Sequence, residues 1–145
     1  MELLYNVQCS IKTEGSTGVE EKKITPSLED YLEAIYVLRE QLHLVRVTDI
    51  AAHLNISKPS VHRALQMLRS MEYVEQERYG DVQLTQAGEQ KAQQVLSRHK
   101  LLKTFFCEVL GVSEKTAEKD ACMTEHVISE ETVQKLQDFI NRAQK

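Results

Sequence analysis

The stretch that decides the fold runs from Val47 to Val74, with the sequence VTDIAAHLNISKPSVHRALQMLRSMEYV. Thr48 and Ser57 are the predicted N-caps of two short helices, and Pro59 lies in the first turn of the second, where its missing N–H is harmless. Asn55 tolerates the left-handed conformation of a tight turn. The predicted buried positions are Ile50, Ala51, Leu54, Val61, Ala64, Leu65 and Leu68. The pattern predicts a helix-turn-helix.

The flanking residues predict a helix before this stretch and a β-hairpin after it. An apolar stripe at three- and four-residue spacing predicts a helix over Leu28–Gln41, with Ser27 as its N-cap. Residues 72–85, EYVEQERYGDVQLT, alternate in two short runs around Gly80, which predicts a hairpin with Arg78 at its tip. A helix-turn-helix followed by a hairpin is a winged helix.

Three further helices are predicted after the hairpin. Thr85 caps a long helix that ends at Gly111, a second runs from about Glu114 to Val127, and Ser129 caps the last. The long helix carries the apolar stripe Ala92, Val95, Leu96, His99, Leu102, Phe106, Val109 and Leu110, and the last carries Val133, Leu136, Phe139 and Ile140. The predicted fold class is therefore mainly α. Residues 1–24 are polar and lack a period, which predicts a flexible leader.

Composition excludes several classes of protein. The 145 residues are 41% hydrophobic and 28% charged, as in a globular domain, and no apolar run is long enough to span a membrane. The N-terminus lacks the basic start and apolar core of a secretory signal, so we expect a cytoplasmic protein. Its cysteines, Cys9, Cys107 and Cys122, are odd in number, which argues against a disulfide framework.

The distribution of charge points to the middle of the chain. The net charge is −4, yet residues 46–110 carry nine Lys/Arg against seven Asp/Glu. A contact with a polyanion is therefore expected from this segment. A generic helical hairpin with a solvated basic face is the alternative. For DNA binding, the predicted phosphate contacts are Arg46, Lys58, Arg69 and Arg78, and the predicted base contacts are Ser60, His62, Arg63 and Gln66. Pro59, in the first turn of the same helix, is also a predicted DNA-binding residue.

A second candidate site lies in the segment KDACMTEHVIS, residues 119–129. Cys122, Glu125 and His126 stand at i, i+3 and i+4, a spacing that places them on one face of a helix. Thiolate, carboxylate and imidazole together are usual ligands of borderline transition metals. The alternative is an ordinary amphipathic turn.

Three other residues have both a structural and a functional interpretation. His99 on an apolar stripe is either a core histidine with a hydrogen-bond partner or a metal ligand. Asp30 lies three residues after Ser27, so it either completes a capping box or binds a cation. Glu33, one turn on, is either a solvated carboxylate or the partner of Asp30.

Five segments in this order and spacing resemble one family, the metal-dependent transcriptional repressors that include the diphtheria toxin repressor and the manganese transport regulator. The segments are TPSLEDYLEAIY, VTDIAAHLNISKPSVHRALQMLRSMEYV, LTQAGE, SRHKLL and ACMTEHVIS, and the similarity extends from about Thr25 to Ile140. The resemblance implies an N-terminal winged helix-turn-helix domain, residues 25–93, followed by an all-helical metal-binding and dimerisation domain, residues 94–145. It also implies that Asp30, Glu33, His99, Cys122, Glu125 and His126 bind one divalent metal ion.

The chain departs from the family pattern at several positions. Asp30 is the acid of manganese-responsive members, whereas Cys122 replaces the glutamate of the manganese transport regulator. Lys103 stands where the family commonly has an acid, which puts a second metal site in doubt or implies other ligands such as Glu118. The chain ends soon after Ile140, so no SH3-like third domain is expected.

The expected function is a homodimeric, divalent-metal-activated repressor that binds a palindromic DNA operator and controls metal uptake in Mn/Fe homeostasis. The expected cofactor is Mn²⁺ or Fe²⁺, with Co²⁺ and Zn²⁺ possible in vitro. A winged-helix regulator that senses redox state through Cys122 or Cys107 is the alternative. No general base or substrate loop accompanies the ligands, so we expect no enzymatic activity, no small organic substrate and no membrane partner.

Overall fold

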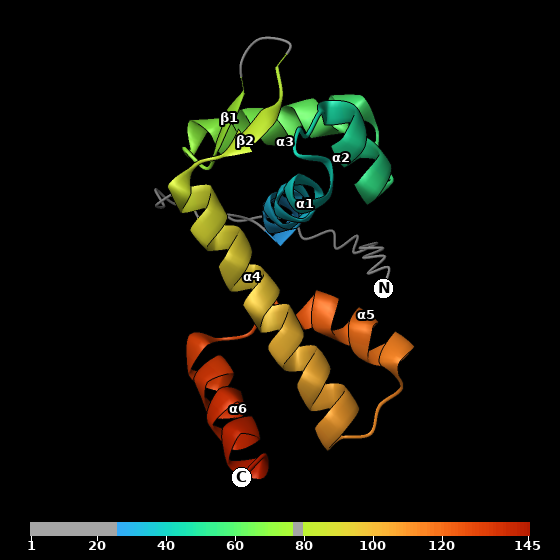
Figure 1. Ribbon diagram of the computed structural model, residues 1–145, viewed down its shortest axis with the longest axis vertical. Coiled ribbons are helices and arrows are strands. Elements are labelled where there is room, and N and C mark those ends of the chain that lie inside the picture. Colours follow the sequence, from blue (N-terminus) through green and yellow to red (C-terminus); the bar gives the residue numbers. More distant parts are fainter. Residues whose placement is uncertain (1–25, 77–79) are drawn as a thin grey trace, which may run out of the picture. The chain divides into compact units, whose positions relative to one another are not determined.

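The computed structural model of the protein describes residues 26–76 and 80–145 (Figure 1). The chain divides between Gln93 and Gln94 into two compact units, within the long helix α4, Gln86–Thr104. The predicted leader lies outside the described residues, as do Arg78 and Tyr79. None of the described helices combines the length and the apolar character that crossing a bilayer requires.

The first unit contains the predicted helix-turn-helix and hairpin. The helices α1, Pro26–Leu42, α2, Val47–Leu54, and α3, Lys58–Ser70, precede the strands β1, Val74–Gln76, and β2, Val82–Leu84. The strands pair antiparallel, with Val74 opposite Leu84. α1 packs against α2, α3 and β2. The seven predicted core positions of α2 and α3 are all buried, which confirms the helix-turn-helix.

The predicted turn after α2 and the predicted N-cap of α3 are confirmed, but the predicted N-caps of α1 and α2 are not. Asn55 is left-handed, with φ of 54°, and the Ser60 N–H donates to Ser57 Oγ at 3.3 Å. Two predicted N-caps are wrong because their helices begin earlier. Thr48 lies inside α2, whose N-cap is Arg46 and whose Asp49 accepts the Arg46 N–H at 2.8 Å. Ser27 follows Pro26, the first residue of α1, so Ser27 lies inside that helix.

Thr85 and Gly88 join the hairpin to α4. Thr85 Oγ1 accepts the Gly88 N–H at 3.1 Å and donates to the Glu72 carbonyl at 2.6 Å, which confirms Thr85 as the cap. The Thr85 N–H donates to the Tyr73 carbonyl at 3.0 Å. A Cβ at Gly88 would lie 1.9 Å from that same carbonyl oxygen. The start of α4 is thus fixed against the base of the hairpin, and only glycine fits there.

Ion pairs connect α1 to the first turns of α4. Arg39 donates from both terminal nitrogens to the Glu89 carboxylate, at 3.1 and 3.2 Å, and its guanidinium lies 5.0 Å from the centre of the Tyr36 ring. The hydrogen bond to Glu89 raises the pKa of Arg39, and the same bond lowers the pKa of the Glu89 carboxyl. Lys91 pairs with buried Glu29 at 3.4 Å. These contacts position α1, which carries two of the predicted metal ligands.

The second unit begins with the remainder of α4 and continues through a π-helical turn, Phe105–Val109, to α5, Glu114–Thr124, and α6, Glu130–Ala143. Gly111, with φ of 70°, ends the long helix as predicted. The predicted apolar stripe fails at its end, where Val109 and Leu110 are 40% and 58% exposed. The reason is the π turn, whose i→i+5 hydrogen bonds change the helical period. Leu110, for example, donates to the Phe105 carbonyl at 3.1 Å.

Side chains of α4 and of the π turn hold α6 in place. Arg98 donates to Glu130 at 2.8 Å, and the Phe105 ring packs edge-on against Phe139 at 6.2 Å between centres. Ser129 caps α6 as predicted and accepts the Thr132 N–H at 3.2 Å. Of the α6 apolar stripe, Ile140 alone is buried, and Phe139 is 45% exposed.

Candidate metal centre and nucleic-acid interface

A buried carboxylate lies between two imidazoles in the second unit. Glu125 Oε2 is 2.5 Å from His99 Nδ1, and Glu125 Oε1 is 3.4 Å from His126 Nε2. The exposed fractions of the Glu125, His99 and His126 side chains are 0%, 1% and 2%. Burying a carboxylate is costly without hydrogen bonds or opposite charge. The two imidazoles offset part of that cost, and they bring His99 of α4 together with the end of α5.

The end of α5 determines how these groups are presented. Thr124 is its last residue, so Glu125 and His126 follow the helix, and the prediction of a helix to Val127 is wrong. The N–H groups of Val127 and Ile128 both donate to the Thr124 carbonyl at 3.0 Å, which closes the helix before α6. Glu125 keeps helical dihedrals and donates its N–H to the Ala121 carbonyl at 2.9 Å. Glu125 thus continues the helical geometry of α5, and His126 lies in the turn that follows it.

The donor set of this unit fits a divalent transition-metal ion. Cys122 lies on the buried face of α5 with Ala117 and Ala121 and is 8% exposed. It stands one helical turn before Glu125, so a thiol, a carboxylate and an imidazole come from five consecutive residues. With His99 they offer sulfur, oxygen and nitrogen, which borderline metals such as Fe²⁺, Co²⁺ and Zn²⁺ accept.

Two carboxylates of α5 and one lysine of α4 extend the cluster. Glu118 Oε1 lies 2.9 Å from His99 Nε2, and its Oε2 lies 2.9 Å from Lys103 Nζ. Lys103 also reaches Glu114, at 3.4 Å, and its hydrogen bond to Glu118 raises the pKa of the Lys103 ammonium. Glu114 was missed by the sequence reasoning. The signal was its spacing, since 114, 118 and 122 follow one another at i+4 and face one side of the helix.

The two remaining predicted ligands, Asp30 and Glu33, lie on α1 in the first unit. Glu33 is 3% exposed, and Asp30, one turn earlier, is partly buried. Burial raises the pKa of Tyr31, the Asp30 carboxylate raises it further, and the Arg63 guanidinium lowers it. The predicted ligand set is therefore divided, with two carboxylates in the first unit and four donors in the second.

The outer face of α3 presents most of the predicted DNA contacts to solvent. Lys58, His62, Arg63, Gln66 and Arg69 are exposed, Ser60 is half-buried, and Arg46 is exposed at the start of α2. Arg78 lies outside the described residues. A basic, solvent-facing second helix is the geometry by which a helix-turn-helix enters the major groove.

Two of these side chains have structural partners. Ser60 Oγ lies 2.8 Å from Ser57 Oγ inside the N-cap of α3. Arg69 donates to Gln76 Oε1 at 3.1 Å, which links α3 to β1. His62, Arg63 and Gln66 therefore remain the side chains best placed to contact base edges.

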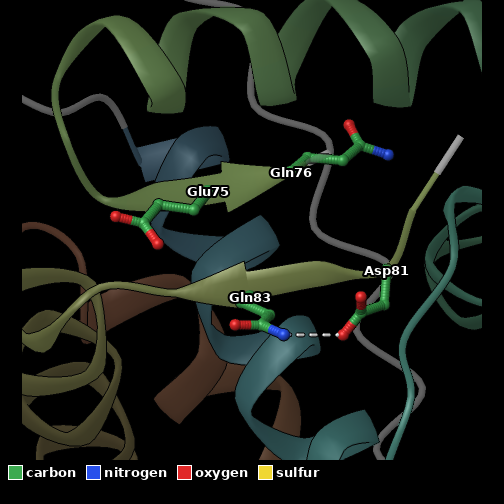
Figure 2. Close-up of a pocket in the computed structure, with 4 residues that line it drawn as sticks. All are labelled: Glu75, Gln76, Asp81 and Gln83. Carbon is green, nitrogen blue, oxygen red and sulfur yellow. Dashed lines mark hydrogen bonds between the residues drawn. The ribbon is translucent and has the colours of Figure 1, made fainter. Parts of the chain in front are cut away.

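The described part of the wing is polar and acidic. A hollow of about 440 Å³ on the hairpin is lined by Glu75, Gln76, Asp81 and Gln83. Figure 2 labels these four side chains. Gln83 donates to Asp81 at 2.9 Å, and Glu75 stands opposite Gln83 in the strand register. Carboxylates here repel phosphate, so among the described residues a phosphate contact near the hairpin depends on Arg69, which lies beside β1.

Two family models match successive parts of the chain. Residues 23–82 match the family model described as the iron dependent repressor, N-terminal DNA binding domain. Residues 85–145 match the iron dependent repressor, metal binding and dimerisation domain. An HTH-type transcriptional regulator of Methanocaldococcus jannaschii is 37% identical over 82% of this chain and 96% of its own length. The HTH-type transcriptional regulator MntR of Geobacillus kaustophilus is 37% identical over 80% of this chain and 82% of its own length.

Solved structures show the same fold. The manganese regulator SloR superposes with a TM-score of 0.72 at 28% identity, over 81% of this chain. The IdeR structure from T. acidophilum gives a TM-score of 0.69 at 25% identity, over 83% of this chain. This chain spans 55% of the SloR chain and 56% of the IdeR chain. The matches confirm the resemblance seen in the sequence. Members of the matched family are transcriptional regulators and not enzymes. The chain belongs to this family, the iron-dependent repressors.

Proposed function

We propose that the chain is a divalent-metal-activated repressor that controls metal uptake in Mn/Fe homeostasis. The observation that carries the proposal is the buried Glu125 carboxylate between His99 and His126, in the segment that matches the family's metal-binding domain. Asp30 and Glu33 of the first unit and His99, Cys122, Glu125 and His126 of the second would hold the ion. Residues 25–93 form the DNA-binding domain in this proposal, and residues 94–145 form the metal-binding and dimerisation domain.

The proposed ligands explain how metal binding would control DNA binding. When bound, the ion supplies positive charge shared by ligands from both units. Without that positive charge, the carboxylates of Asp30, Glu33 and Glu125 would repel one another. The domain arrangement that brings these ligands together is therefore favoured only when the ion is bound. The two recognition helices of a dimer can bind a palindromic operator only when the distance between them matches the spacing of its half-sites. The result is a population shift toward the DNA-competent arrangement, with no new contact to DNA.

Exposed apolar side chains of the second unit support the homodimer. Leu110, Met123, Val127 and Phe139 are 58%, 42%, 71% and 45% exposed. Apolar surface of this kind marks an interface when it is contiguous. Because a repressor must have access to the DNA that carries its operator, we also propose that the protein is located in the cytoplasm.

The nature of the ligands bears on the choice of metal. Asp30, Glu33 and Glu125 favour harder ions such as Mn²⁺, whereas the Cys122 thiolate favours Fe²⁺, Co²⁺ or Zn²⁺. We propose Mn²⁺ or Fe²⁺ as the physiological signal, in keeping with the iron-dependent repressor family and with MntR as a relative.

The test is DNA binding as a function of metal. Selection from randomised duplexes gives an operator, and fluorescence anisotropy then measures its affinity with Mn²⁺, Fe²⁺, Co²⁺ or Zn²⁺, each with a chelator control. We expect metal to tighten binding by about 5- to 150-fold. Glu125→Gln should abolish this response, and Glu131→Gln, on the exposed face of α6, should keep it. Operator affinity that ignores chelator but responds to peroxide would refute the proposal and favour redox sensing through Cys122 or Cys107.

A further inference from the structure

Lys103 occupies a position among three potential metal ligands of the second unit. Its ammonium lies 2.9 Å from Glu118 Oε2 and 3.4 Å from Glu114 Oε1. The other oxygen of Glu118 lies 2.9 Å from His99 Nε2. Two carboxylates and, through Glu118, an imidazole are thus arranged around one positive charge.

This arrangement forms one end of a continuous chain of charged groups. From the surface inward the order is Lys103, Glu118, His99, Glu125 and His126, each within 3.4 Å of the next. The Lys103 and Glu118 side chains are 26% and 34% exposed, whereas those of His99, Glu125 and His126 are 1%, 0% and 2% exposed. The chain of charged groups therefore has a buried end at Glu125 and His126 and a partly exposed end at Lys103 and Glu118.

The two ends differ in the charge that they offer to a cation. At the outer end, the negative charge of Glu118 is already matched by an ammonium at hydrogen-bond distance. A divalent ion there would have to displace Lys103 and share Glu118 with it, while facing repulsion from the ammonium. The Lys103 ammonium has no lone pair to donate, so it cannot itself become a ligand while it is protonated.

We propose that Lys103 is a tethered cation that closes the outer end of this cluster, so that each protomer binds a single divalent ion, at the Glu125 end. In this role Lys103 is also a positioning residue, because it holds Glu118 against His99 Nε2. The inference rests on the proposed metal binding and adds its stoichiometry. It predicts that removal of the ammonium opens a second cation site at the Glu114 and Glu118 carboxylates, which Lys103 now contacts.

The experiment is a metal count on the full chain. Equilibrium dialysis against Mn²⁺ or Co²⁺, followed by elemental analysis, should give one tightly held ion per protomer for the wild type. Lys103→Glu adds a carboxylate and should raise the count to two, with a second Co²⁺ absorption band of oxygen-rich coordination. Lys103→Met keeps the aliphatic stem and should gain a weaker second ion. The double variant Lys103→Glu/Glu118→Gln should return to one, and Lys119→Met, an exposed lysine of α5, serves as the matched control.

The outcomes separate this inference from the proposed function. A wild type that binds two ions per protomer would overturn the inference whatever the variants do, so the test does not depend on their folding. A wild type with one ion, together with folded Lys103 variants that also bind one, would overturn it too. A wild type that binds no ion at all would instead refute the proposed function itself.

Discussion

Glu125 and His99 are separated by 26 positions in the sequence, yet Glu125 Oε2 lies 2.5 Å from His99 Nδ1, and their side chains are 0% and 1% exposed. The pair links α5 to α4, so the same groups that we propose as metal ligands also hold the second unit together. Removal of one partner leaves the other buried with less compensation. Stability and metal response are therefore coupled at this pair.

The first prediction concerns stability without metal. Glu125→Ala should lower the free energy of unfolding by about 3–5 kcal/mol, because it leaves His99 and His126 facing an empty volume. Glu125→Gln should cost less, since the amide keeps the shape and can still hydrogen-bond. Urea denaturation in chelator, followed by circular dichroism, measures both. Equal stability of Glu125→Ala and the wild type would show that the contact between Glu125 and His99 does not stabilise the second unit.

The proposed metal ligands were predicted from the sequence in two different ways. Cys122, Glu125 and His126 were found by spacing, which reports a shared helix face. For His99, Asp30 and Glu33 the sequence pattern left a structural and a functional interpretation open, and the family resemblance favoured the functional one. Spacing could not show that α5 ends at Thr124, since the capping bonds to its carbonyl depend on the path of the chain toward α6.

Gly88 provides the second prediction. A Cβ there would lie 1.9 Å from the Tyr73 carbonyl oxygen, and the same oxygen accepts a hydrogen bond from the Thr85 N–H. Gly88→Ala should therefore destabilise the first unit by about 1–3 kcal/mol, because backbone must shift to make room. Thermal denaturation measures the change. Gly111→Ala is the matched control, because a Cβ at Gly111 would meet no neighbouring atom. Gly111 has φ of 70°, so backbone strain of about 1–2 kcal/mol is the expected cost there. An unchanged melting temperature for Gly88→Ala would contradict the close contact.

The third prediction is a pH dependence. The pKa of Glu89 is lowered in the fold by its hydrogen bond to Arg39. A carboxyl with a depressed folded-state pKa stabilises the protein above its unfolded-state pKa, and this contribution is lost as the pH falls through the folded-state value. The urea midpoint of the wild type should thus exceed that of Glu89→Gln at neutral pH, and the two should converge in acid. Glu40→Gln, at an exposed neighbour of Arg39, is the control. A difference that persists unchanged at low pH would mean that the pair does not act through charge.

Local features with a short-range cause were predictable, and those set by tertiary contact were not. Asn55, Ser57 and Thr85 were assigned correctly, because each meets a backbone requirement within a few residues. The π turn at Phe105–Val109 was not foreseen, since its sequence fits an α-helix equally well and its period changes only through packing such as Phe105 on Phe139. The Lys103–Glu118 contact lies across two helices and has no sequence signature at all.

The last prediction separates base recognition from phosphate binding on α3. Arg63 and Lys58 are both exposed on the outer face of α3, but Arg63 lies one turn into the helix whereas Lys58 is its first residue. Arg63→Ala should cost about 1–3 kcal/mol at one operator position and relax the base preference there. Lys58→Ala should weaken binding to all sequences alike and reduce the salt slope by about one unit, because one fewer counterion is released.

Anisotropy titrations at several salt concentrations, with operator variants at each base pair, distinguish the two effects. Arg142→Ala, exposed on α6 in the other unit, is the matched control and should change neither quantity. Arg69→Ala tests a mixed case, because Arg69 also donates to Gln76 and should weaken the attachment of the hairpin as well as phosphate binding. If Arg63→Ala lowers affinity equally for every operator variant, Arg63 contacts phosphate, and base readout falls to His62 and Gln66, which share its exposed face.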